Sequence, residues 1–389
     1  MTHPLLDKSI TTLSELIAFP TISTEPNQAI IDYLGKRLET LGAKVDIYRD
    51  RTQGKANLFA TLGPDVAGGI VLSGHTDVVP TQGQPWSNAP FTLYKSEDGT
   101  RLFGRGTCDM KGFIACTLVM AEEYAKLNLK KPIHFAFTHD EETGCLGAQE
   151  LVKQLAMRPH LPNIAIIGEP TQMHPIEGHK GCYEYTTRFH GLEGHSSRPD
   201  LGVNTIEFAA RYITKLLSLR EILIQRAPEK SRFTPPYTTL GFGRLVSGTA
   251  HNVIPNHAQL YWEMRPVQDA DADFVKNALD TYVTQELLPQ MQAVYKGANI
   301  TTEPVAEVKG LEPMKNNQAR NLIANLTGAN EAGLVSFGTE AGLFQSLGLN
   351  VIVCGPGSIE QAHKADEFIE TSQMSLCLDL LGKLPNHLL

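Results

Sequence analysis

Short apolar runs that alternate with helical patterns constrain the fold of this chain more than any other feature of its sequence. Four such runs are predicted to be strands: 69–73, 133–138, 164–167 and 351–354. Helical patterns separate the first three runs, at 110–126 and 146–155, and two amphipathic helices are predicted ahead of them, at 5–18 and 29–41. This alternation is typical of an α/β fold, so we expect a mostly parallel sheet covered by helices on both faces.

The stretch between the third and fourth runs follows another pattern. Its predicted elements come in the order strand, helix, strand, strand, helix, strand: 183–189, 204–220, 238–246, 257–265, 272–288 and 300–308. That order is typical of a ferredoxin-like α+β unit. The chain of 389 residues also exceeds the ~250–300 residues over which one hydrophobic core keeps growing. We therefore expect a main domain formed by residues 1–179 and 311–389, with a ferredoxin-like domain inserted at 180–310.

The composition indicates an ordinary globular protein and argues against several functional classes. Hydrophobic residues make up 42% and charged residues 20%, a balance without a sign of disorder. The net charge is -8 and no Lys/Arg-rich run occurs, so we expect no nucleic-acid partner. No apolar run approaches the ~18–20 residues of a membrane span, and the first residues lack the order of a signal peptide. The six cysteines contain no CxxC pair, which indicates free thiols and a cytoplasmic protein.

Acidic and histidine residues follow the predicted strands of the main domain. They are His75 and Asp77 after the first, Asp140, Glu141 and Glu142 after the second, Glu169 after the third, and His363 after the fourth. Asp109 lies just before a predicted helix. In open α/β sheets, ligands bind beyond the carboxyl ends of the strands, so these side chains should converge.

Carboxylates that converge without partners repel one another and take up protons. Divalent cations remove that repulsion, and a mixture of imidazoles and carboxylates suits zinc, cobalt or manganese better than calcium or magnesium. More acidic groups gather here than one closed tetrahedral site needs. We therefore predict two divalent ions, zinc first and cobalt as the alternative, bridged by one carboxylate at roughly 3.5–4 Å.

Five segments, in this order, resemble motifs of the M20 family of metallopeptidases and deacylases. They are residues 74–80 (Gly-His-Thr-Asp-Val-Val-Pro), 104–112 (Gly-Arg-Gly-Thr-Cys-Asp-Met-Lys-Gly), 140–144 (Asp-Glu-Glu-Thr-Gly), 168–171 (Gly-Glu-Pro-Thr) and 361–363 (Gln-Ala-His). Each motif is weak by itself, whereas five in matching order and spacing are specific. The resemblance implies that the main domain is catalytic and that the inserted domain is a lid and dimerisation domain.

The resemblance also implies the role of each converging residue. His75 and Glu169 would bind one ion. Glu142 and His363 would bind the other, and Asp109 would bridge the pair.

Three further residues receive catalytic roles from the same resemblance. Asp77 would orient the imidazole of His75, and Glu141 would act as the general base and then the general acid. His195 would donate a hydrogen bond to the scissile carbonyl. In the family the matching histidine belongs to the inserted domain and often acts from a partner subunit, which implies a homodimer through that domain.

Structural alternatives exist for several of these residues. Residues 140–142 could form a solvated acidic turn, although the apolar strand before them and Gly144 after them favour a site. Asp109 could simply lie near a helix N-terminus, a position that is compatible with bridging metals. His195 could form a hydrogen bond only within its own turn.

The substrate predictions rest on fewer residues. Asn252 and Arg265 resemble family residues that hold a substrate carboxylate, and a surface ion pair is an equal alternative for Arg265. Residues 338–341 (Gly-Thr-Glu-Ala) and 355–358 (Gly-Pro-Gly-Ser) resemble the branch of the family that deacetylates N-acetylornithine. Within the first of these motifs, Glu340 could pair with a substrate ammonium group.

Together, these features predict two-metal hydrolysis of the amide bond of a small N-acyl amino acid. The best single expectation is N-acetyl-L-ornithine, cleaved to L-ornithine and acetate in arginine biosynthesis. A desuccinylase of succinyl-diaminopimelate, an aminoacylase and a dipeptidase are alternatives within the same chemistry. A catalytically inactive metal-binding or regulatory protein is the alternative of another class.

Overall fold

The computed structural model of the chain describes residues 3–50 and 54–389, and these divide into two compact units. The first unit extends to Gly178 and continues at Pro313–Leu334 and Thr339–Leu389. The second consists of His179–Glu312 with the short piece Val335–Gly338. The sequence predicted the insertion at 180–310, and no local pattern marked Val335–Gly338 as part of it.

An eight-stranded sheet forms the centre of the first unit, in the order β1-β2-β6-β3-β7-β16-β8-β15. The strands are β1 Lys44–Asp50, β2 Lys55–Leu62, β3 Ile70–His75, β6 Ile133–Thr138, β7 Ile164–Pro170, β8 Ile176–His179, β15 Gly333–Val335 and β16 Asn350–Gly355. The central strands β6, β3, β7 and β16 are parallel, whereas β1, β2 and β8 pair antiparallel with their neighbours. The predicted parallel sheet is confirmed at its centre, and every residue of β3 and β6 is buried, as expected for strands covered on both faces.

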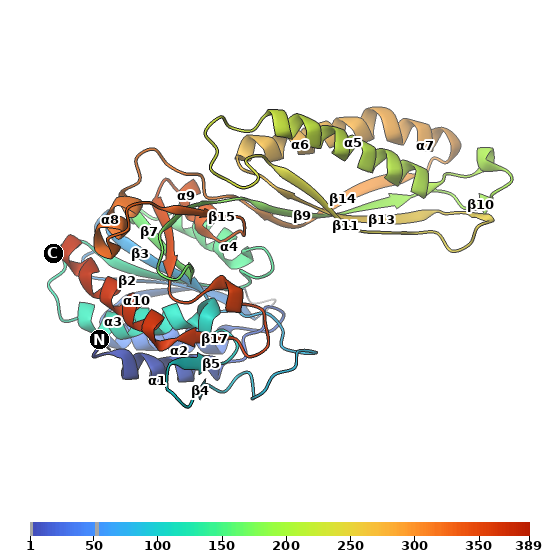
Figure 1. Cartoon of the computed structure of the whole chain (residues 1–389). Helices are drawn as coiled ribbons and strands as arrows, with labels where there is room; N and C mark the ends of the chain where they lie inside the picture. Colours follow the sequence, from blue (N-terminus) through green and yellow to red (C-terminus); the bar gives the residue numbers. More distant parts are fainter. Residues whose placement is uncertain (1–2, 51–53) are drawn as a thin grey trace. The chain divides into compact units, whose positions relative to one another are not determined.

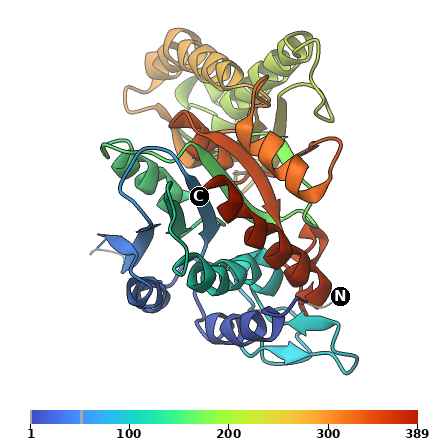
Figure 2. The ribbon, with the colours of Figure 1, turned by 90° about the vertical axis from the view of Figure 1, so that its left-hand side faces the viewer.

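Helices cover both faces of this sheet (Figures 1 and 2). They are α1 Leu6–Ile17, α2 Gln28–Thr40, α3 Gly112–Tyr124, α4 Leu146–Leu155, α8 Gln318–Thr327, α9 Ala341–Ser346 and α10 Thr371–Lys383. Helix α3 packs on β3 and β7 and is itself covered by α1 and α10. This double cover explains why α3 is buried on almost all sides. None of the helices in the described residues combines the length and apolarity that a membrane span requires.

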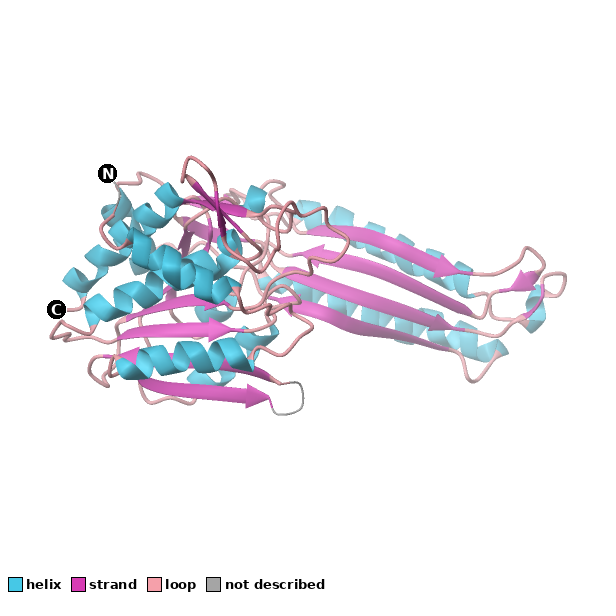
Figure 3. Cartoon of the chain, turned by 90° about the horizontal axis from the view of Figure 1, so that it is seen from below, coloured by secondary structure: helices cyan, strands magenta, loops and turns pink. Residues whose placement is uncertain are grey.

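The second unit is a four-stranded antiparallel sheet in the order β11-β13-β9-β14, with helices on one face (Figure 3). Its elements are β9 Cys182–His190, α5 Thr205–Gln225, β11 Thr239–Ser247, β13 His257–Arg265, α6 Asp269–Tyr282, α7 Leu288–Val294 and β14 Asn299–Val308. The chain order and the strand order are those of the predicted ferredoxin-like unit. Two short strands, β10 Gly194–His195 and β12 Val253–Ile254, pair with each other.

One predicted helix of this unit is wrong in its extent. The sequence predicted a continuous helix at 272–288, but α6 ends at Tyr282, a π-helical turn follows at Val283–Leu287, and α7 begins at Leu288. Pro289 lies in the first turn of α7 and has no backbone N–H. The residues at both junctions keep right-handed helical dihedral angles, so the chain is helical from Asp269 to Val294 and the π-helical turn lies just ahead of the proline.

Candidate metal centre and active site

The five predicted metal ligands all belong to the first unit, and the structure brings them together. His75 ends β3, Glu169 lies near the end of β7, Glu142 follows β6, Asp109 precedes α3, and His363 follows β16. The His75 Nε2 atom lies 2.9 Å from Asp109 Oδ1 and 3.8 Å from Glu169 Oε1. The His363 Nε2 atom lies 2.9 Å from Glu142 Oε2 and 3.5 Å from Asp109 Oδ2. Asp109 therefore faces both histidines, one through each carboxylate oxygen.

These residues offer overlapping sets of ligand atoms for cations. One ligand atom each of His75, Asp109 and Glu142 lie within 4.8 Å of one another, and the same holds for His75, Glu141 and Glu169. Among the described residues, Glu169 Oε1 is a buried oxygen without a hydrogen-bond partner. A buried acceptor without a donor is costly unless a cation neutralises it, so the donor set fits a pair of divalent ions.

The electrostatics of the cluster point the same way. Burial raises the pKa of Glu169 well above its usual range, and the negative charge of Asp109 adds to this effect. Burial also opposes ionisation of Asp109, but hydrogen bonds from His363 and His75 hold its pKa below the usual value. Hydrogen bonds to Asp109 and Glu142 raise the pKa of His363 to about 10. A divalent cation among these groups would favour the ionised carboxylates and the neutral imidazoles.

Asp77 connects one imidazole with the acidic turn after β6. Its backbone carbonyl lies 2.9 Å from His75 Nδ1, and its carboxylate oxygen Oδ1 lies 3.5 Å from the same nitrogen. The Asp77 carboxylate also accepts hydrogen bonds from the backbone N–H of Glu141 at 3.1 Å and of Glu142 at 3.3 Å. The sequence predicted the first contact, and the second shows that Asp77 also holds the turn that carries Glu141.

Glu141 lies in this turn with its carboxylate directed at the cluster. Burial raises its pKa to about 8, and the charges of Glu142 and Asp109 contribute to the rise. The thiol of Cys145 lies 3.4 Å from Glu141 Oε1. A carboxylate whose pKa is close to neutrality is suited to accept and return a proton.

The sequence predicts no role for Asp140 or for Lys55. The structure pairs them in a buried ion pair, with Lys55 Nζ 2.6 Å from Asp140 Oδ1. Asp140 has a φ of 52°, so the chain reverses sharply just before Glu141. In the sequence, only a lysine at the start of an apolar strand points to this ion pair, and its position does not indicate which acidic residue it contacts.

The segment that carries Asp109 differs from the prediction. A helix was expected from Met110, but Asp109 (φ -121°, ψ 93°) and Met110 (φ -135°, ψ 32°) are not helical, and α3 begins at Gly112. Helical geometry would direct successive side chains around an axis. The irregular backbone instead lets the Asp109 carboxylate reach both His75 and His363.

Three predicted site residues belong to the second unit. His195, in β10, is exposed, and its Nδ1 accepts a hydrogen bond from the backbone N–H of Ser197 at 3.2 Å. The proton of a neutral ring therefore resides on Nε2, which is the donor that an oxyanion requires. Asn252 lies beside this turn and accepts a backbone hydrogen bond from Ser196 at 3.1 Å.

Arg265 lies at the opposite end of β13 from this turn. Strand β13 runs from His257 to Arg265, which at about 3.3 Å per residue separates its ends by on the order of 25 Å. Within one copy of the unit, Arg265 and Asn252 therefore lie too far apart to bind the same substrate carboxylate. The guanidinium pairs with Glu263 at 2.8 Å, the ion pair that was the alternative prediction.

The hypothesis that Glu340 pairs with a substrate ammonium group is not supported by its position. Glu340 has no exposed surface, and its carboxylate accepts hydrogen bonds from Ser73 Oγ at 2.5 Å and Thr138 Oγ1 at 2.8 Å. Ser73 belongs to β3 and Thr138 to β6, so the carboxylate links two neighbouring strands. Each of its oxygens accepts a hydrogen bond from one of these hydroxyl groups, and the side chain lies in the interior of the sheet.

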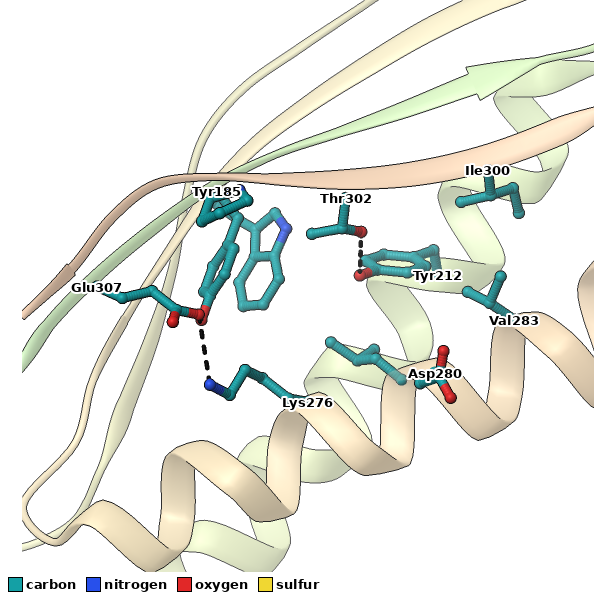
Figure 4. A pocket seen from close by; sticks show the side chains of 11 residues that line it. Tyr185, Tyr212, Lys276, Asp280, Val283, Ile300, Thr302 and Glu307 are labelled. Atoms are coloured by element: carbon teal, nitrogen blue, oxygen red, sulfur yellow. Dashed lines mark hydrogen bonds and ion pairs between the residues drawn. The ribbon is translucent and has the colours of Figure 1, made fainter.

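A separate cavity of about 310 Å³ lies within the second unit (Figure 4). Its walls include Tyr185, Tyr212 and Trp262. Asp280 and Glu307 are its acidic residues, and Glu307 is engaged by the Tyr185 hydroxyl at 2.6 Å and by Lys276 at 3.4 Å. None of the predicted site residues lines it, so the cavity is separate from the metal-ligand cluster.

Comparisons with known proteins identify the family of this chain. The model of peptidase family M20/M25/M40 matches residues 71–387. An acetylornithine deacetylase of Erwinia tasmaniensis is 36% identical over 96% of this chain and 96% of its own. One from Proteus mirabilis is 38% identical over 95% of this chain and 94% of its own.

Solved structures share the fold. An M20 family metallo-carboxypeptidase from Sulfolobus solfataricus superposes with a TM-score of 0.74 at 18% sequence identity, over 97% of this chain and 98% of its own. At this identity the likeness concerns the fold alone. The family match and the relatives together confirm the predicted resemblance and a metal-dependent hydrolase: the chain belongs to peptidase family M20/M25/M40.

Proposed function

We propose that this chain hydrolyses the amide bond of N-acetyl-L-ornithine, releasing L-ornithine and acetate in arginine biosynthesis. The observation that carries the proposal is the convergence of five ligand side chains with Glu141 beside them. The relatives named acetylornithine deacetylase support the substrate, because they match nearly the whole chain at 36–38% identity.

The cluster would hold two divalent ions, with zinc the first choice and cobalt the alternative. His75 and Glu169 would bind one ion, Glu142 and His363 the other, and Asp109 both. Nitrogen and carboxylate donors in this mixture support that choice. Such ions supply Lewis-acid activation of water and of the amide carbonyl.

The residues of this chain then divide the proton transfers among them. Glu141 would accept a proton from the attacking water and pass it to the leaving amine nitrogen, which becomes the α-amino group of ornithine. The raised pKa of Glu141 favours return of the proton, while bound cations would favour its ionised form. His195 would donate from Nε2 to the developing oxyanion.

The substrate is tested by a panel of N-acyl amino acids. N-acetylornithine should give the highest kcat/KM among N-acetylornithine, N-acetylmethionine, succinyl-diaminopimelate and a dipeptide. A higher kcat/KM for any of the other three would assign the chain to that activity instead.

A catalytically inactive metal-binding protein is separated from an enzyme by Glu141→Ala. Turnover should fall by roughly 10²–10⁴-fold, because a general base is lost, while the metal content remains that of the unaltered chain. Full activity in this variant would contradict the role of Glu141. A chain that binds metal but turns over no substrate of the panel would favour the inactive protein.

We also propose a homodimer that forms through the second unit. Strand β11 is at an edge of its sheet and exposes Phe242, Leu245 and Val246. An edge strand with exposed apolar side chains favours pairing with another strand. A dimer would also supply Asn252 and Arg265 to one site from different copies. Sedimentation velocity should show a dimer, and Leu245→Glu should shift it towards monomer.

The cytoplasm is the compartment we propose for this activity. No disulfide links any of the six cysteines in the described chain, which suits a reducing environment. Cell fractionation should recover the deacetylase activity with cytoplasmic markers.

A further inference from the structure

The structure assigns a positioning role to Glu367, a residue outside the predicted ligand set. We propose that Glu367, paired with Arg105, holds the segment of Asp109 and the segment of His363 in the one arrangement that allows both to bind metal. This inference rests on the proposed metal centre and concerns two residues that do not themselves touch the ions.

The Glu367 carboxylate accepts four hydrogen bonds. Oε1 accepts from the backbone N–H of Cys108 at 2.8 Å and of Asp109 at 3.0 Å. Oε2 accepts from the backbone N–H of Gly106 at 2.9 Å and from Arg105 Nη1 at 2.8 Å. These donors fill the roughly four lone-pair positions of a carboxylate, so the side chain is held in one orientation.

The backbone segment held by Glu367 does not supply acceptors for all of its own N–H groups. Gly106 has a φ of 83°, and the chain from Thr107 to Lys111 contains non-helical residues, including Asp109. The N–H groups of Cys108 and Asp109 are thus buried outside regular secondary structure. Because buried N–H groups need acceptors, the Glu367 carboxylate replaces the carbonyl groups that a helix would provide. The direction of the Asp109 side chain follows from that backbone.

Arg105 extends the same network to His363. Its side chain is 1% exposed, and Nη2 donates to Gln84 Oε1 at 2.6 Å. Gln84 in turn donates to the backbone carbonyl of His363 at 2.8 Å, and Arg105 Nη1 reaches the carbonyl of Lys364 at 3.2 Å. The guanidinium also lies over the ring of Trp86, 5.0 Å from its centre.

The His363 segment depends on these bonds more than on packing. The His363 side chain is 53% exposed, and its φ of 62° lies in the left-handed region, which non-glycine residues rarely adopt. Glu367 follows it by four residues, just before β17 (Phe368–Glu370), which pairs with β5 (Arg101–Phe103). One buried ion pair therefore joins the two segments that carry Asp109 and His363.

The test compares Glu367→Gln with Glu177→Gln. Glu177 is a buried carboxylate of the same unit that pairs with Arg320 at 2.8 Å, in a strand that carries no predicted ligand. Each substitution removes the negative charge of a buried glutamate that pairs with an arginine and keeps the side-chain shape, although Arg320 is 29% exposed and Arg105 is 1% exposed. Metal-free proteins would be titrated with zinc in competition with a chelator, and folding would be checked by circular dichroism and thermal unfolding.

Glu367→Gln should weaken at least one zinc site by roughly 10–100-fold, the usual loss when a partner of a metal ligand is removed. It should also alter the absorption spectrum of the cobalt-loaded protein, and excess zinc should restore part of kcat. Glu177→Gln should leave zinc affinity and the cobalt spectrum unchanged even if its melting temperature falls as far. Equal zinc affinities in the two folded variants would overturn the positioning role.

Two other outcomes are a variant that does not fold and an unaltered chain that binds no metal. If Glu367→Gln does not fold, Gln84→Ala takes its place, because this half-buried side chain is the link to His363. It should weaken zinc binding to a smaller degree, and unchanged binding would contradict the proposal. If the unaltered chain binds no zinc or cobalt, the proposed metal centre itself fails, which is a different result from equal affinities.

Discussion

The two units place their candidate functional residues in contrasting surroundings. In the first unit, Asp77, Asp109 and Glu169 are at most 5% exposed. A carboxylate oxygen of each lies within 4 Å of the His75 ring. In the second unit, His195 is exposed and held by contacts within its own turn. Charged groups are costly to bury, so the first arrangement persists only where each group has a partner or a cation.

The difference teaches how the work of catalysis is divided. The first unit holds the proposed metal ligands and the proposed base Glu141 among buried groups that contact one another, which suits the precise geometry that a metal site requires. The second unit offers a proposed donor, His195, that is exposed and is held by contacts within its own turn. Substitutions in the first unit should therefore affect stability and metal together, and those near His195 should affect turnover alone.

The largest effect is expected from Lys55→Met. It removes the lysine partner of Asp140, which is 4% exposed, and leaves this buried carboxylate beside His139, whose Nδ1 lies 3.1 Å from Asp140 Oδ2. The free energy of unfolding should fall by about 3–5 kcal/mol, measured by urea denaturation. The double variant Lys55→Met with Asp140→Asn should recover part of this loss. A loss below about 1 kcal/mol would show that the pair behaves like one on the surface.

His195→Ala should lower kcat by roughly 10²–10³-fold, because an oxyanion donor is removed. Zinc affinity and the urea midpoint should stay at the values of the unaltered chain, since the side chain is exposed. Ser197→Ala is the matched control in the same turn, because the backbone N–H of Ser197 still bonds to Nδ1. The contrast between the units fails if His195→Ala loses zinc, and the donor role fails if kcat is unchanged.

Acid should destabilise the first unit through His134. Burial lowers the pKa of this residue to about 4, compared with about 6.5 for a free imidazole. Between these values the unfolded chain binds the proton and the folded chain does not, so the free energy of unfolding falls as pH falls from about 6.5 to about 4. The contribution is roughly 3 kcal/mol, and His134→Phe should show that much less loss over this range. An identical pH dependence in both proteins would contradict the assignment.

The smallest effect is expected from Asp200→Asn in the second unit. Arg198 and Asp200 form an ion pair at 2.8 Å, but both side chains are 60% exposed. Solvent screens such a pair, so the urea midpoint should not change measurably. A loss as large as that of Lys55→Met would remove the distinction between the two units.

Much of the fold could be predicted because periodicity is a local property. Residues 133–138 and 146–155 were predicted as a strand and a helix, and β6 and α4 have these bounds. Strand β1 was missed because Lys44–Asp50 lies at the sheet edge, where most positions are only partly buried and the apolar signal is weak. The π-helical turn at Val283–Leu287 was not predicted because the helical pattern continues across it.

The sequence alone determined which residues could bind metal, because ligand chemistry belongs to each side chain and the strand ends that carry them can be read from local patterns. Only the tertiary structure decided that Glu340 is buried between strands and that Glu367 supports Asp109. Arg105 and Glu367 are 262 residues apart in the chain, so no local pattern links them. Their pairing follows from packing, which brings β5 and β17 together and leaves two buried charges with one another as partners.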